Sequence, residues 1–138
     1  AHAATKAAAT AADALEALVR SYVARYAQRL PMFRLATQGS LLSPQAARLA
    51  RQQLDAIRPL NDLMYGPTER KLRAAQRAGR ADAALDPRRL AFIAHTSAMG
   101  LLTMQLMVSS VDDPLRHPPK ALVDELCRTL RSAVGGPG

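Results

Sequence analysis

The pattern of hydrophobic and polar positions predicts a set of α-helices packed around one unusually apolar segment. Residues 90–111 carry no formal charge, although 22% of the residues in the chain are charged. Asp86 precedes this segment as a helix N-cap, Pro87 suits the first helical position, and the Asp-Asp-Pro sequence at 112–114 ends it. Because the predicted helix is apolar on all sides, it needs cover on every face.

The first part of the chain contains an amphipathic helix behind a low-complexity start. Residues 1–12 are rich in alanine and are expected to form a loose lead-in. Apolar residues at helical spacing predict a helix over residues 13–30. Pro31 ends this helix because proline disfavours a helical residue before it, and Pro31 can open a short helix that contains Phe33.

Prolines and glycines divide the middle of the chain. A cap-plus-proline start at Pro44 predicts a helix that bends or breaks at Pro59. The Gly-Pro pair at 66–67 is expected to interrupt the helical pattern. A strongly basic helix follows over residues 68–78, and Gly79 ends it.

Composition favours an all-α fold. The chain has 28 Ala and 20 Leu but only eight Val and Ile together, so its apolar residues are mostly helix formers rather than strand formers. Its 138 residues suit one domain, which we place at 13–134. This domain ends in a helix over residues 119–134, before a loose tail at 135–138. The single cysteine, Cys127, excludes an internal disulfide and suits a reducing compartment, so a cytoplasmic location is expected.

The net charge of +8 raises the question of a nucleic-acid or membrane partner. The best basic stripe lies on one helical face and consists of Arg70, Arg73, Arg77 and Arg80. No aromatic residues interleave it for base stacking, so a solvated face is its ordinary meaning. Residues 90–111 are long enough to span a membrane, but the His, Thr, Gln and Ser residues within them favour a soluble core helix and no membrane partner.

The sequence offers little support for catalysis or for a metal site. The three histidines, His2, His95 and His117, lie far apart, and no pair of His or Cys residues has the spacing of metal ligands. No glycine-rich loop follows a strand, and no pair of carboxylates falls in an apolar stretch. We therefore expect neither an enzyme nor a cofactor.

His95 stands out because an ionisable group within the most apolar helix must be hydrogen-bonded or line a cavity. A lone histidine of this kind is more often a satisfied core residue, and the alternative is a polar anchor in a ligand pocket. Tyr22, Tyr26 and Tyr65 would supply further polar handles for such a pocket. The residues predicted to bind a ligand are Tyr22, Tyr26, Phe33, Met64, Phe92, His95 and Met99.

A second copy of the chain is the expected cover for the other side of the apolar helix, because two-fold homodimers are the commonest oligomers. A monomer in which this helix is simply the core is the alternative. The residues predicted for the dimer interface are Ala94, Ala98, Leu101, Gln105, Leu122, Leu126 and Leu130. The pattern leaves open which face of the helix lines a pocket and which face meets the partner.

Three stretches of sequence, taken in order, resemble the C-terminal regulatory domain of TetR-family transcriptional regulators. They read ALEALVRSYVARYAQRLPMFRLATQGS, RAAQRAGRADAALDPRRLAFIAHTSAMGLL and ALVDELCRTLRSAV. The likeness covers residues 13–134 and rests on order and spacing. It implies a homodimer in which the last two long helices form a four-helix bundle with their mates, and a small apolar effector held inside each subunit.

The DNA-binding head of that family, a three-helix unit with a helix-turn-helix, is not among these residues. The resemblance therefore implies contact with DNA only through an upstream head, whose DNA binding the effector controls. The alternative is a stand-alone helical ligand carrier or protein-interaction module that does not bind DNA.

Overall fold

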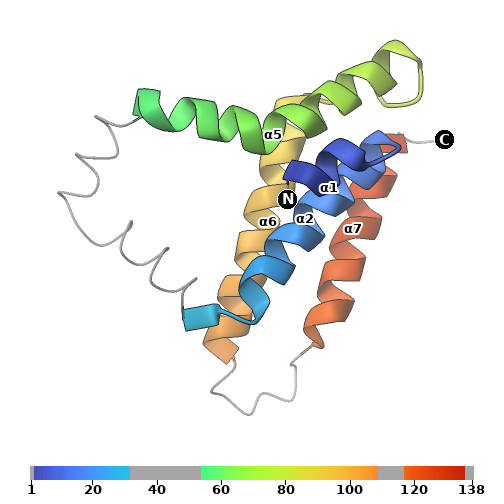
Figure 1. Cartoon of the computed structure of the whole chain (residues 1–138). Helices are drawn as coiled ribbons and strands as arrows, with labels where there is room; N and C mark the ends of the chain where they lie inside the picture. Colours follow the sequence, from blue (N-terminus) through green and yellow to red (C-terminus); the bar gives the residue numbers. More distant parts are fainter. Residues whose placement is uncertain (1, 32–53, 109–116, 136–138) are drawn as a thin grey trace.

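The structure, a computed structural model of the whole chain, describes residues 2–31, 54–108 and 117–135. Within these ranges the chain forms five helices and no strand, which confirms the predicted all-α fold. The helices are α1 (His2–Ala7), α2 (Ala11–Ala27), α5 (Leu54–Arg77), α6 (Pro87–Val108) and α7 (Pro119–Gly135) (Figure 1). The predicted short helix with Phe33 and the predicted helix start at Pro44 lie outside the described residues.

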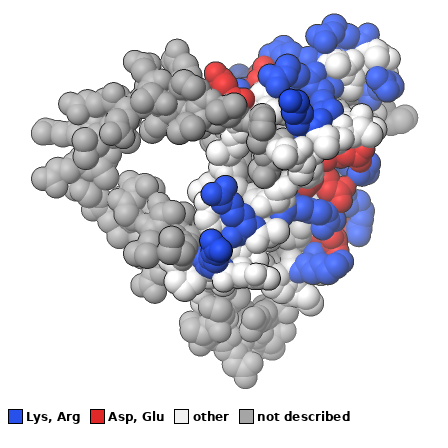
Figure 2. All heavy atoms as spheres, viewed as in Figure 1, with Lys and Arg blue, Asp and Glu red and all other residues white. Residues whose placement is uncertain are grey.

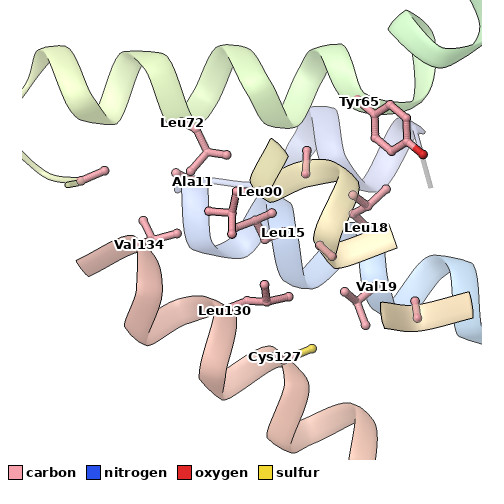
Figure 3. Close-up of a cluster of buried hydrophobic side chains, with 14 of the residues drawn as sticks. Ala11, Leu15, Leu18, Val19, Tyr65, Leu72, Leu90, Cys127, Leu130 and Val134 are labelled. Atoms are coloured by element: carbon pink, nitrogen blue, oxygen red, sulfur yellow. The ribbon is translucent and has the colours of Figure 1, made fainter. Parts of the chain in front are cut away.

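Helix α2 lies at the centre of the bundle, a place that the sequence predicted for the more apolar α6. It contacts each of the other four described helices, and Figure 1 shows it between α6 and α7, with α5 crossing near one end. Its Leu15, Leu18 and Val19 are fully buried, and Figure 3 shows side chains of α5, α6 and α7 around them. Burying each such side chain contributes about 1.5–3 kcal/mol. The central helix of the described subunit is therefore α2, and α6 packs against one side of it.

A capping box begins α2. The Thr10 hydroxyl accepts a hydrogen bond from the Asp13 N–H, and the Asp13 carboxylate accepts one from the Thr10 N–H, both at 3.1 Å. These reciprocal bonds satisfy amides that the helix itself leaves without a partner. The helix consequently starts at Ala11 rather than at residue 13, and it ends at Ala27, ahead of Pro31.

Helix α5 runs without interruption through Pro59 and through the Gly-Pro pair at 66–67, where the sequence predicted a break. Both residues of the pair are buried, so packing stabilises a helical backbone that the local sequence disfavours. Figure 1 shows α5 changing direction along its length, as expected for a helix that contains proline. The end of the helix matches the prediction. Gly79 has a φ of 66°, and the Arg80 N–H donates to the Ala75 carbonyl oxygen at 2.8 Å.

The start of α6 and the bounds of α7 also follow the sequence. Oδ1 of Asp86 accepts hydrogen bonds from the N–H groups of Arg88 and Arg89, at 2.9 and 3.0 Å, and Pro87 occupies the first helical position. Helix α7 extends one residue beyond the predicted last helix. The residues that it buries against the core are Val123, Cys127, Leu130 and Val134.

Candidate functional site

Three helices bring a hydrogen-bonded group of aromatic side chains together along α6. Tyr65 of α5 places its hydroxyl oxygen 2.6 Å from Nδ1 of His95, in a buried hydrogen bond. Tyr22 of α2 packs against the imidazole, with 4.5 Å between the ring centroids and 90° between the ring planes. We call Tyr22, Tyr65 and His95 the aromatic cluster. Because its members lie far apart in the sequence, the cluster forms only when α2, α5 and α6 pack together.

Two more rings border the aromatic cluster. The ring of Tyr26 lies 5.1 Å from that of Tyr22, one turn further along α2. The ring of Phe92 lies 6.2 Å from that of Tyr65, one turn before His95 on α6. Figure 3 shows Tyr65 at the edge of the buried leucine side chains. The cluster is thus a polar region bordered by aromatic and aliphatic groups.

Burial keeps the hydrogen-bonded pair uncharged near neutral pH. His95 is only 9% exposed, and this burial lowers its pKa below the ordinary 6.5 because the imidazolium ion loses its water. Burial raises the pKa of Tyr65 above its ordinary value, and the nearby Arg88 partly opposes that shift. At pH 7 the pair therefore consists of a neutral imidazole and a neutral phenol.

One arrangement of hydrogens satisfies this pair best. If the Tyr65 hydroxyl donates to Nδ1, one buried group stays without a partner among the described residues, the Nε2–H of His95. If Nδ1–H donates instead, both the Tyr65 hydroxyl hydrogen and the Nε2 lone pair lack a partner there. Each buried polar group left unpaired costs about 1–3 kcal/mol. We therefore assign Tyr65 as the donor and place the imidazole hydrogen on Nε2.

A paired cation lies against the outer side of Tyr65. The guanidinium carbon of Arg88 is 5.4 Å from the centroid of the Tyr65 ring. Arg88 also forms ion pairs with Asp62 at 2.9 Å and with Glu69 at 3.2 Å. The sequence did not single out Arg88, because its partners lie on a different helix. The positive charge beside the cluster is already matched by two carboxylates.

A surface groove of about 450 Å³ opens beside the aromatic cluster. It is lined by Tyr65, Arg88, Arg89, Phe92 and Ile93, so it shares two side chains with the cluster and its border. Its size falls within the usual range for small-molecule sites, about 300–1,000 Å³. A second hollow of about 420 Å³ lies where the start of α2 meets the ends of α5 and α7, and none of the predicted ligand residues lines it.

Most of the predicted ligand residues lie in or beside the aromatic cluster. Those in or beside the aromatic cluster are Tyr22, Tyr26, Phe92 and His95. Met64 and Met99 are partly buried, and Phe33 lies outside the described residues. The sequence named Tyr65 as a polar handle but not as the partner of His95. Between α2 and α6, the rings of Tyr22 and His95 are in direct contact.

Several of the predicted dimer-contact residues face the core of their own subunit. Ala94 and Ala98 are completely buried and Leu130 is 5% exposed, so these three offer almost no surface to a second chain. The remaining four are partly buried: Leu101, Gln105, Leu122 and Leu126. The prediction for Ala94, Ala98 and Leu130 is thereby corrected. For Ala94 and Ala98 the physical reason is that a helix that is apolar all round, such as α6, gives no sign of which face turns inward.

The opposite side of α6 carries the exposed apolar residues. We call it the exposed α6 face, and its members are Phe92, Ile93, Thr96, Gly100, Thr103, Met104 and Met107. Its phenylalanine, isoleucine and two methionines are each more than half exposed. Both threonines donate their hydroxyl hydrogens to backbone carbonyls one turn earlier in the helix. The face is therefore more apolar than its composition indicates.

Helix α6 is also long and apolar enough to cross a membrane, judged by length and composition alone. The core helix of a soluble protein meets the same criterion, so this property is weak evidence for a membrane. Only 22% of its most apolar 18-residue window is buried in the described subunit. The rest of that window is partly buried or exposed, so one side of the helix lacks cover from the described helices.

The basic stripe along the last part of α5 and the turn that follows it is exposed to solvent, as predicted. Arg70, Arg73, Arg77 and Arg80 are all exposed, and Arg73 forms an ion pair with Glu69 at 2.8 Å. Figure 2 shows lysine and arginine side chains gathered at the end of the molecule where α5 terminates.

In the part of the chain that the structure describes, no group of three or more His, Cys, Asp or Glu residues is placed to hold a metal ion. Comparison with protein-family models, with curated proteins and with solved structures finds no match for this chain.

Proposed function

We propose that this chain is the effector-sensing and dimerisation domain of a TetR-like transcriptional regulator. In this role it pairs with a second copy of itself and holds a small, largely apolar ligand in each subunit. The observation that carries the proposal is the exposed α6 face, an uncharged apolar surface along the one side of the helix that the described subunit leaves uncovered.

A second copy of α6 is the cover that fits this surface. The 22-residue helix is about 33 Å long, and monomeric soluble proteins rarely expose apolar patches on that scale. In a two-fold dimer each copy covers the same face of the other, so one interface satisfies both chains. A side chain built at Gly100 meets nothing within 4 Å in the subunit. The partner helix therefore has room to approach closely at that point.

The position of the aromatic cluster supports a sensing role, because it lies on the same helix as the exposed α6 face. His95 projects into the subunit while the residues of that face project outward. A ligand held beside His95 would therefore act on the helix that sets the geometry of the dimer. The ligand changes DNA affinity only if it binds one arrangement of the dimer more tightly than another. A hundredfold difference between these two affinities corresponds to about 2.7 kcal/mol. Contact with DNA would come through an upstream helix-turn-helix head.

Light scattering during size-exclusion chromatography tests the dimer. At micromolar concentration we expect twice the 14.8 kDa mass of one chain. Met104→Glu places a charge on the exposed α6 face and should produce a monomer with unchanged helix content by circular dichroism. Ala74→Glu adds the same charge at an exposed position on α5 and should leave the dimer intact. A monomeric wild-type chain, or a Met104→Glu variant that stays dimeric, would contradict the proposal.

The regulatory part has its own test. The coding sequence upstream of the codon for Ala1 should encode a helix-turn-helix. An upstream sequence that encodes no such element would remove the transcriptional role and favour a stand-alone ligand carrier or interaction module.

A further inference from the structure

We propose that the Nε2–H of His95 holds the ligand by a hydrogen-bond acceptor oxygen, so that the site takes uncharged, largely apolar compounds with a carbonyl or similar oxygen. This inference rests on the proposed ligand-sensing function and adds the chemical class of the ligand.

The unpartnered nitrogen of a nine-tenths buried side chain carries this inference. With Tyr65 assigned as the donor to Nδ1 of His95, at 2.6 Å, the ring's hydrogen lies on Nε2. Nε2 itself is buried and has no hydrogen-bond partner among residues 2–31, 54–108 and 117–135. A buried donor is normally paired. The missing partner must therefore present an acceptor, since the nitrogen carries a hydrogen.

The charges around the aromatic cluster argue for a neutral ligand. Arg88, the cation beside Tyr65, is already paired with Asp62 and Glu69. An anionic ligand would have to compete with these two carboxylates for Arg88. A cationic ligand would meet a donor at His95, where it needs an acceptor. An uncharged oxygen satisfies the nitrogen without either cost.

The surroundings of the cluster suit an apolar ligand body. Tyr65, a member of the cluster, and Phe92, which borders it, also line the groove of about 450 Å³. Aromatic walls with a few placed polar groups are the usual composition of small-molecule sites. The groove therefore brings a compound of modest size beside Tyr65 and the aromatic cluster, although His95 is not among the residues that line it.

Matched probes test the inference on the full chain. Acetophenone and ethylbenzene differ only by a carbonyl oxygen in place of two hydrogens, and benzoate carries a charge on a ring of the same size. We measure their dissociation constants by nuclear magnetic resonance titration. Acetophenone should bind roughly three- to tenfold more tightly than ethylbenzene, the value of one hydrogen bond. Benzoate should bind more weakly than acetophenone.

Variants locate the effect at one side chain. His95→Phe should bring acetophenone and ethylbenzene to equal affinity. His117→Phe makes the same substitution at an exposed histidine outside the cluster and should leave the difference unchanged. In the wild-type chain, ¹⁵N spectra of the imidazole should show the hydrogen on Nε2, and the Nε2 resonance should move on addition of acetophenone. This last measurement needs no variant to fold.

Four results would overturn the inference: equal binding of acetophenone and ethylbenzene to the wild type, tighter binding of benzoate, a hydrogen on Nδ1, or an Nε2 resonance that no probe moves. The last result would mean that Nε2 is paired only with an ordered water molecule. Light scattering on the same samples separates this test from that of the proposed function. A dimer without the carbonyl preference contradicts only the inference, whereas a monomer with that preference contradicts only the dimer.

Discussion

The hydroxyl group of Tyr65 is the most direct place to test the arrangement of hydrogens in the aromatic cluster. Tyr65→Phe removes one oxygen atom and leaves the ring that packs against its neighbours, so it opens little cavity. The change deletes the donor that lies 2.6 Å from Nδ1 of His95. The imidazole then has two buried nitrogens without a partner among the described residues instead of one.

The expected magnitudes follow from counting these unpaired groups. Tyr65→Phe should lower the free energy of unfolding by about 1–3 kcal/mol, the cost of leaving a buried acceptor unsatisfied. His95→Phe leaves the Tyr65 hydroxyl without its acceptor but also removes the orphaned Nε2–H. These two effects have similar size and opposite sign, so His95→Phe should cost about 1 kcal/mol or less. The double variant should cost no more than Tyr65→Phe alone.

Thermal and urea unfolding followed by far-ultraviolet circular dichroism measure these differences. For a chain of this length, 1 kcal/mol corresponds to roughly 3–5 °C in Tm. All variants are compared at one protein concentration, because the dimer proposed above would make the apparent stability depend on concentration. If His95→Phe costs about 1–3 kcal/mol, as Tyr65→Phe does, Nε2 has a partner after all, which contradicts an unpaired Nε2–H.

Two further outcomes concern pH and the end of α5. Burial lowers the pKa of His95, so below pH 6.5 the unfolded chain takes up a proton that the folded chain resists, and stability is lost as the pH falls. Urea unfolding between pH 7 and 5 should show this loss of unfolding free energy, at most about 1.4 kcal/mol per pH unit. His95→Phe should reduce the dependence of the unfolding free energy on pH. If that dependence is unchanged in the variant, the lowered pKa of His95 is contradicted. Gly79→Ala should destabilise the chain by about 1–2 kcal/mol because Gly79 has a φ of 66°. Gly135→Ala, which also meets nothing within 4 Å, should stay within about 0.5 kcal/mol, and equal effects of the two would show that backbone conformation is not the cause.

Several boundaries of the helices could be read from the sequence because the interactions that set them are local. Asp86 caps the amides two and three residues ahead of it, and Pro87 has a backbone angle that suits the first turn. Gly79 ends α5 because a left-handed residue closes the helix there. The all-α fold followed in the same way from helix formers at helical spacing. Each of these features depends on residues within about one turn of one another.

Other features were decided only when distant segments packed together. The Gly-Pro pair at 66–67 predicts a break, yet burial within the bundle keeps α5 continuous across it. The partnership of Tyr65 with His95 joins residues thirty positions apart, and no local pattern encodes it. The sequence left the inward face of α6 undetermined for a different reason. A helix that is apolar all round has no periodic pattern of hydrophobic and polar residues. Only its packing against α2 and α5 determines that Ala94 is buried and Met104 is exposed.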